Sequence, residues 1–148
     1  MTALMAQNKG AGKNDRMREG FRCGLTLAII YGIAIFLICF IFARPLMIMF
    51  VKDEEVIRHG VTYLHLISIM YLLPALTNGI QGYFRGIGDL KITRISSFVN
   101  MGVRVLAALP LVFIFGLGIE ALPFSYLAGW VGMLIAEVPL LVKTYKLY

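Results

Sequence analysis

Apolar residues in this chain come in long unbroken runs, with no strict alternation of apolar and polar positions. The first run, residues 23–43, contains no Asp, Glu, Lys or Arg, and residues 60–84 contain none either. Two later runs are interrupted only by isolated charges. A helix of about 20 apolar residues crosses the roughly 30 Å hydrocarbon layer of a bilayer. The pattern therefore predicts four transmembrane helices, over residues 23–43, 60–84, 95–117 and 118–142.

The segments between these runs are short and polar. Although Arg44 follows the first run, apolar residues continue to about residue 51. The first 22 residues are basic and have no apolar core before a small-residue cleavage site, so a cleaved signal peptide is not expected. The predicted segments outside the membrane are a basic N-terminal arm, an external loop, a cytoplasmic loop and a cytoplasmic tail, over residues 1–22, 44–59, 85–94 and 143–148.

The composition agrees with this reading. Of the 148 residues, 59% are hydrophobic and 15% are charged, with a mean hydropathy of +0.82. These values lie outside the range of soluble domains, and helices satisfy their own backbone hydrogen bonds in lipid. We expect an all-α integral membrane protein, multi-pass in the cell membrane, whose first partner is the lipid bilayer.

The positive charges predict the orientation. Ten Lys and Arg residues flank the spans on the side of the two chain ends, and three lie on the other side. Because cytoplasmic segments are rich in Lys and Arg, both termini are expected in the cytoplasm. The net charge of +6 then reflects topology and attraction to anionic lipid. A nucleic-acid partner is not expected, since no basic stripe is interleaved with aromatic residues.

The stretch AQNKGAGKNDR, Ala6 to Arg16, resembles a phosphate-binding loop but lacks residues that such a loop requires. Gln7 stands where the first glycine is needed, Asn14 follows Lys13 where Ser or Thr is needed, and a membrane helix comes next. No nucleotide is expected. No metal site is expected either, because no group of ligands has suitable spacing. The chain is not expected to be an enzyme, since no nucleophile and base lie at helical spacing.

Two charges inside the predicted spans need partners. An arginine near the bilayer centre costs about 2.5–3.5 kcal/mol on insertion scales. Arg104 and Glu137 approach the membrane interior from the same side, and a long arginine side chain can bridge a difference in depth. We therefore predict an intramembrane Arg104 to Glu137 pair, with Asn100 as a second contact of Arg104. The alternative is that each side chain reaches the headgroups separately.

Prolines interrupt two of the predicted spans, at Pro74 and Pro110. Such breaks are tolerated in membranes where neighbours or a cavity satisfy the freed carbonyls. Polar and aromatic side chains near them are candidates for lining a cavity for a large cationic substrate. Helix packing and an aromatic interface belt are the alternative explanation. The candidate cavity residues are Tyr63, Tyr71, Asn78 and Gln81.

Two short polar segments with glycines, which we call corners, lie one before the first predicted membrane helix and one after the second. The first, within AQNKGAGKNDR, is similar to the Q-N-x-G-A-G motif of the multidrug and toxic compound extrusion (MATE) family. The second, YFRGIGDLKITR, resembles that family's R-G-x-G-D-x-K/R-x-T corner. Between them, FVKDEEVIRHGVTYL resembles its short external loop, in which Asp53 is expected to cap a helix. The corner residues are Gln7, Asn8, Gly10 and Gly12 in the first corner, and Arg85, Gly86, Gly88 and Asp89 in the second.

The resemblance implies a fold and a place within it. Members of the family are cation-coupled antiporters with twelve helices in two six-helix lobes, and this chain resembles the last four helices of one lobe, about a third of a transporter. Arg104, in VNMGVRVLAALPL, resembles an arginine that is common in the second lobe. The chain also stops soon after its last span, at VKTYKLY. Both features favour the second lobe, and the first lobe stays open.

The implied function is part of a secondary active multidrug efflux transporter, which exports organic cations by alternating access. The remaining helices, in cis or from another chain, would complete it. The resemblance implies that the coupling ion, Na⁺ or H⁺, binds on those helices, where most of the acidic residues proposed to bind it in the family lie. An additional acid, sometimes found on the helix that matches residues 60–84, has no counterpart in this chain. The corners are expected to hold helix ends together while the lobes rock. Two alternatives are a stand-alone four-helix membrane protein, acting as a dimeric exporter or structural subunit, and a flippase-like transporter of the same superfamily.

Overall fold

Seven α-helices make up the chain in the part that the computed structural model describes, residues 1–118 and 121–145. Every regular element in that part is an α-helix. Residues 119–120 of the expected fourth span and 146–148 of the expected tail lie outside the described residues. The helices are α1 (Thr2–Gly10), α2 (Asn14–Ile41), α3 (Ala43–Phe50), α4 (Glu54–Met70), α5 (Leu72–Gly86), α6 (Leu90–Phe113) and α7 (Ala121–Tyr145).

Three of the described helices, α2, α6 and α7, are each long and apolar enough to cross a membrane, and α4 with α5 meets the same test as one bent pair. By length and composition, the described residues therefore contain three candidate spans, or four if the bent pair is counted as one span. Most large apolar side chains on α2 and α6 are exposed in the chain itself. Such surfaces are stable when lipid or other helices cover them.

At the corner end of the bundle the membrane helices extend beyond the charge-free runs, whereas at the other end α2 stops at Ile41 and α6 at Phe113, short of the expected residues 43 and 117. The helix expected over 23–43 begins at Asn14, the one expected over 95–117 begins at Leu90, and the one expected over 118–142 continues to Tyr145. Charges mark the limit of the hydrocarbon layer, whereas the helix continues through polar residues of good helix propensity. The arm expected over 1–22 is accordingly helical in α1 and in the start of α2.

The span expected over 60–84 is broken at Tyr71, where α4 and α5 meet at a bend of 42°. Pro74 accounts for the position of the break. Proline has no amide hydrogen to donate to the carbonyl of Met70, four residues earlier, and its ring clashes with that carbonyl. The amide of Tyr71 instead bonds the Ser68 carbonyl at 3.1 Å, a tighter turn that closes α4.

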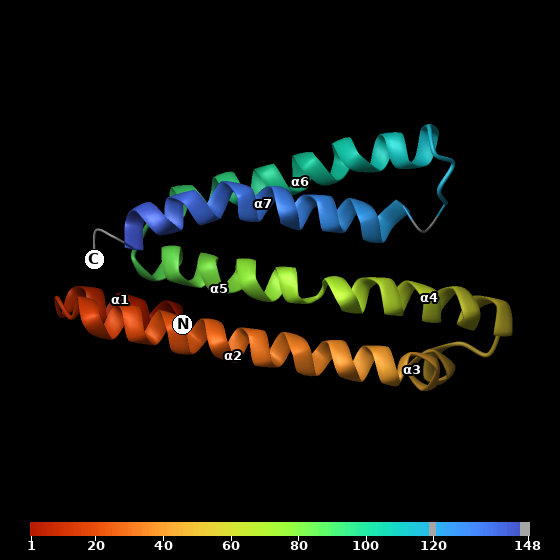
Figure 1. Ribbon diagram of the computed structural model, residues 1–148, viewed down its shortest axis with the longest axis horizontal. Coiled ribbons are helices and arrows are strands. Elements are labelled where there is room, and N and C mark those ends of the chain that lie inside the picture. Colours follow the sequence, from red (N-terminus) through yellow and green to blue (C-terminus); the bar gives the residue numbers. More distant parts are fainter. Residues whose placement is uncertain (119–120, 146–148) are drawn as a thin grey trace.

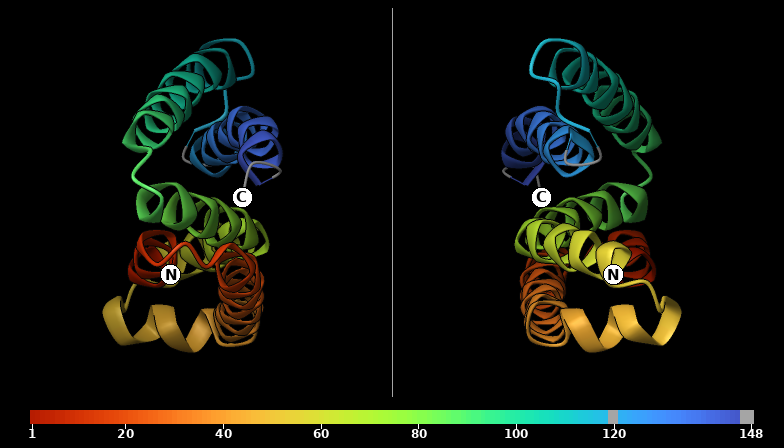
Figure 2. Two further views of the ribbon diagram at one scale, coloured as in Figure 1. Left: turned by 90° about the vertical axis from the view of Figure 1, so that its left-hand side faces the viewer. Right: turned by 90° about the vertical axis from the view of Figure 1, so that its right-hand side faces the viewer.

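The expected external loop, residues 44–59, contains most of α3 and the first six residues of α4. Figure 2 shows the short helix α3 lying across the end of the bundle, whereas the long helices run along it. Asp53 caps α4, because its Oδ1 accepts hydrogen bonds from the amides of Glu55 at 2.9 Å and Val56 at 3.2 Å. The predicted cap is confirmed, and Glu54 and Glu55 occupy the first turn, where the helix dipole favours acidic side chains.

The helices form three tiers (Figures 1 and 2). The hairpin of α6 and α7 is one outer tier, the row of α4 and α5 is the middle, and α2 with α1 is the other outer tier. In Figure 1 the turn after α1, the turn after α5 and the end of α7 lie at the left-hand end. A core of buried side chains sits at this corner end, made of Met5, Met17, Phe21, Ile80, Tyr83, Phe84, Ile87 and Ile92.

Helices α1 and α5 approach each other closely at Gly86, which leaves no room for a side chain there. A Cβ at Gly86 would collide with Cβ of Met5 and lie 2.7 Å from the Thr2 carbonyl oxygen, whereas a Cβ at Gly102 would have nothing within 4 Å. We expect Gly86→Ala to lower the free energy of unfolding by roughly 1–3 kcal/mol. Thermal unfolding in detergent, compared with Gly102→Ala as the matched control, measures this. Equal stability of the two variants would contradict it.

Candidate functional site

The first corner is a tight turn between α1 and α2. Gly12 has φ +66°, a backbone conformation that L side chains rarely adopt. The amides of Ala11 and Lys13 donate to the carbonyls of Gln7 and Asn8, at 3.1 and 2.9 Å. These bonds satisfy carbonyls at the end of α1 that the helix itself leaves open. Gly10, by contrast, lies in open space.

The second corner has the same construction between α5 and α6. Gly88 has φ +83°. The amide of Asp89 donates to the Phe84 carbonyl at 2.9 Å, and that of Ile87 donates to the Tyr83 carbonyl at 3.0 Å. Both corners therefore stop a helix with a positive-φ glycine and start the next one within a few residues.

The two corners are in direct contact. Lys9 Nζ donates to the carbonyl of Ile87 at 2.6 Å, and Thr2 Oγ1 donates to the carbonyl of Gly82 at 3.3 Å. Met5 is 0% exposed and fills the space that a side chain at Gly86 would need. The sequence indicated the two motifs but not Thr2 and Met5, because nothing in the chain before Gln7 marked α1 as a helix that packs on α5.

A basic groove of about 570 Å³ runs beside this contact. Lys9 lines it from the first corner, and Lys91 and Arg94 line it from the start of α6, with Asp89 among them. Arg85, on the last turn of α5, is exposed at the same end. The corner end of the bundle thus presents a positively charged surface.

A second group of polar residues lies inside the bundle, where α5, α6 and α7 meet. Glu137 is 0% exposed. Its Oε1 accepts a hydrogen bond from Gln81 Nε2 at 3.1 Å. The Ser96 hydroxyl, on α6, lies near this carboxyl. Nevertheless Glu137 Oε2 and Ser96 Oγ are both buried without a well-formed hydrogen bond.

Arg104 lies further along the same helix hairpin, against the aromatic side chains of α7. Its Cζ is 3.6 Å from the centroid of the Tyr126 ring, and Tyr126 stacks on Trp130 at 5.7 Å. Gly129 makes room for this arrangement, because a Cβ there would collide with Cγ of Arg104. A cation over an aromatic face gains about 0.5–2 kcal/mol, depending on its desolvation.

The structure does not bring Arg104 and Glu137 together, and the described chain has no ion pair between them. The register of α6 against α7 is the reason. It places Arg104 beside Gly129, which lies about 12 Å along α7 from Glu137 at 1.5 Å per residue. Asn100 faces α7 as well, with its Nδ2 3.4 Å from the Met133 sulfur rather than on Arg104.

The four candidate cavity residues do not share one cavity. Tyr71 and Asn78 line a groove of about 310 Å³ between α2 and α5, together with Tyr31. Gln81 is buried against Glu137 instead. Tyr63, on α4, lies near Tyr126 and Arg104.

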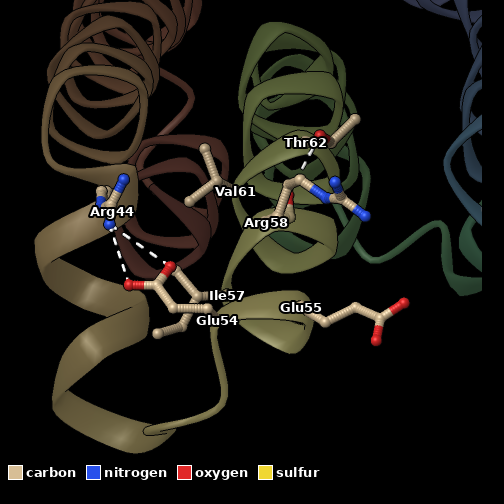
Figure 3. A pocket seen from close by; sticks show the side chains of 7 residues that line it. All are labelled: Arg44, Glu54, Glu55, Ile57, Arg58, Val61 and Thr62. Carbon is tan, nitrogen blue, oxygen red and sulfur yellow. Dashed lines mark hydrogen bonds and ion pairs between the residues drawn. The ribbon is translucent and has the colours of Figure 1, made fainter.

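The opposite end of the bundle carries an ion pair on its surface. Arg44 Nη2 lies 3.0 Å from Glu54 Oε1, which joins the start of α3 to the start of α4 (Figure 3). The two side chains are 63% and 73% exposed, so the pair contributes at most about 1 kcal/mol. It borders a hollow of about 690 Å³. Glu55 and Arg58, which also line it, point away from the Arg44 side in Figure 3.

Comparisons with known proteins agree with the corner motifs. A family model described as MatE matches residues 1–110. The chain is also similar to the probable multidrug resistance protein NorM of Thermotoga maritima, with 24% identity over 138 residues. This alignment covers 93% of the chain and 28% of the relative, so the chain spans little more than a quarter of that protein's length. No solved structure matches the chain.

Glu137 is hydrogen-bonded to Gln81 and is not paired with Arg104, and double-mutant cycles distinguish the two partners. In double-mutant cycles built from Gln81→Met, Arg104→Met and Glu137→Met, we expect a coupling of about 1 kcal/mol or more between Gln81 and Glu137, because a buried hydrogen bond is lost. We expect about zero between Arg104 and Glu137, because the two are not in contact. Unfolding free energies in detergent supply the cycles. A large coupling energy between Arg104 and Glu137 would instead support the ion pair predicted from the sequence.

Proposed function

The chain belongs to the MatE family, and from this membership we propose that it forms the last four membrane spans of a secondary active multidrug efflux transporter. It is a multi-pass membrane protein. The observation that carries the proposal is the family match over residues 1–110, which takes in both corners and the bent α4 and α5 pair. The relative spans far more sequence than this chain. The remaining helices, in cis or from another chain, therefore complete the transporter.

In this proposal the chain supplies the closing part of the second lobe. Transport follows alternating access, in which helix bundles rock about a fixed site near the membrane midplane. The contact between the two corners, through Lys9, Met5 and Gly86, keeps the ends of α1 and α5 together as the lobe moves. The exported substrate is an organic cation, and the coupling ion, Na⁺ or H⁺, binds on helices outside this chain.

The experiment that tests the function uses the complete transporter in membrane vesicles. Efflux of a fluorescent organic cation is measured with a sodium gradient and a pH gradient imposed separately. Export driven by one of the two gradients is the expected result. Export that needs neither gradient would contradict the antiporter assignment.

We also propose that the corner end faces the cytoplasm. The basic groove at this end, lined by Lys9, Lys91 and Arg94, supports the orientation, because cytoplasmic flanks of membrane spans are rich in positive charge. The opposite end, with the Arg44 to Glu54 pair, then faces outward.

Single-cysteine labelling tests the orientation. In a background carrying Cys23→Ser and Cys39→Ser, we expect Glu55→Cys to react with a membrane-impermeant maleimide in intact cells, because Glu55 is exposed at the outer end. Lys13→Cys, at the first corner, should react only after the cells are permeabilised. The reverse labelling pattern would invert the topology.

Within the proposed transporter, the groove between α2 and α5 is our candidate for substrate contact. Tyr31 and Tyr71 offer aromatic faces there, and Asn78 offers an amide. Aromatic rings attract organic cations through their negative faces. The mostly apolar lining with few polar groups is typical of small-molecule sites.

A pair of substitutions tests this groove. We expect Asn78→Leu to raise the KM for an organic cation by about tenfold, equivalent to roughly 1.4 kcal/mol of binding energy, at an unchanged protein level. Ser97→Leu is the matched control, because Ser97 is an exposed polar residue on α6 outside the groove. Equal KM values for the two variants would remove Asn78 from the substrate path.

A further inference from the structure

The junction of α5, α6 and α7 buries an acid without a cation beside it. Glu137 is 0% exposed, and the described residues place no Lys, Arg or His within ion-pair distance of it. One of its oxygens accepts from Gln81, and the other has no hydrogen-bond partner. This burial is complete within the described chain, so no additional helix is needed to produce it.

A bare carboxylate is costly in such a place. Moving an ionised carboxylate out of water costs several kcal/mol even after relaxation, unless an opposite charge and full hydrogen bonding compensate. Here one amide N–H faces Oε1 and one hydroxyl faces the carboxyl. Protonation removes the charge and turns the unpartnered Oε2 into a donor.

We propose that Glu137 is a proton-binding site that fastens α7 to α5 and α6. A proton taken from water forms an O–H bond at Oε2, and this hydroxyl donates to Ser96 Oγ. Oε1 keeps the hydrogen bond from Gln81. Glu137 Oε2 and Ser96 Oγ, which have no hydrogen-bond partner in the structure, then bond to each other. The inference goes beyond the proposed function, because it concerns the chain itself and requires no transport.

The charged groups around the site are few. From α5, Arg85 acts on the carboxyl, but it is exposed on the last turn of that helix and its charge is screened by water. From α6 the facing group is the Ser96 hydroxyl. Arg18 of α2 lies over Tyr145, about 12 Å further along α7. α4 meets α7 near Tyr126, about 16 Å away in the other direction.

The neighbours also favour a proton over a metal cation. A hard cation such as Na⁺ takes several oxygen ligands. Around Glu137 the groups are the amide N–H of Gln81, the Met133 sulfur 4.0 Å from that nitrogen, and a single hydroxyl. The two carboxylate oxygens, one of them already accepting from Gln81, and one hydroxyl oxygen do not make a cation cage.

Infrared difference spectroscopy of the chain in phosphatidylcholine nanodiscs tests the proposal. At neutral pH we expect a protonated-carboxyl C=O band that disappears in Glu137→Gln and persists in Glu55→Gln, which removes an exposed acid of α4. Ser96→Ala should keep the band but shift it, because the hydrogen bond from Oε2 is lost. Absence of the band in the wild-type chain, or its persistence in Glu137→Gln, would overturn the proposal. An unshifted band in Ser96→Ala would overturn the assignment of Ser96 as acceptor.

Thermal unfolding gives a second measurement that needs no spectroscopic assignment. Because the folded chain binds the proton more tightly than the unfolded chain, stability should fall as pH rises, by up to about tenfold in the folding equilibrium per pH unit. The slope should be smaller in Glu137→Gln and no smaller in Glu55→Gln, because the helix dipole favours the ionised form of Glu55 in the folded chain. Equal slopes in wild type and Glu137→Gln would contradict the proposal. Replacing choline chloride by sodium chloride should change neither readout, and a band lost only in sodium would assign the site to a metal cation.

Discussion

The packing of α1 against α5 is the contact on which the corner end of the bundle depends. α1 has nine residues, and an isolated helix of that length is not stable in water. Its place is fixed by Met5, which is buried against Gly86, and by the Lys9 hydrogen bond to the Ile87 carbonyl. Phe21, Tyr83 and their neighbours build the core around this contact. The positive-φ glycines of both corners let the chain turn closely enough for the contact to form.

Much of the fold could be predicted from where charges are missing. Lipid tolerates few charges in a span, so runs such as residues 23–43 and 60–84 mark membrane helices. The break at Tyr71 follows from Pro74, since the lost hydrogen bond lies four residues earlier. α1 and α3 were missed, because each is stabilised by contacts with other helices and at least one end of each lies among charged residues.

Contacts between helices were harder to predict than the helices themselves. Depth below the membrane surface suggested that Arg104 and Glu137 meet. The register of α6 against α7 instead depends on small residues, such as Gly129, where the Arg104 stem packs. One turn of α-helix shifts a partner by about 5.4 Å, so an estimate of depth alone does not select between neighbouring residues. Gln81 is a partner of Glu137 from a third helix, which no spacing within α6 or α7 indicates.

Buried and exposed residues are distributed unevenly along the bundle. On α5, every residue from Gly79 to Phe84 is buried, whereas α4 has only Ile57, Ser68 and Met70 buried. In Figure 1 the α6 and α7 hairpin lies close to α5 at the corner end and diverges from α4 at the other. Close-packed regions resist deformation, and sparsely packed ones open at lower cost. A helix bundle packed this way opens most easily at the end away from the corners. The Glu137 junction lies on the packed side of that division, where the buried carboxyl of α7 meets Gln81 of α5.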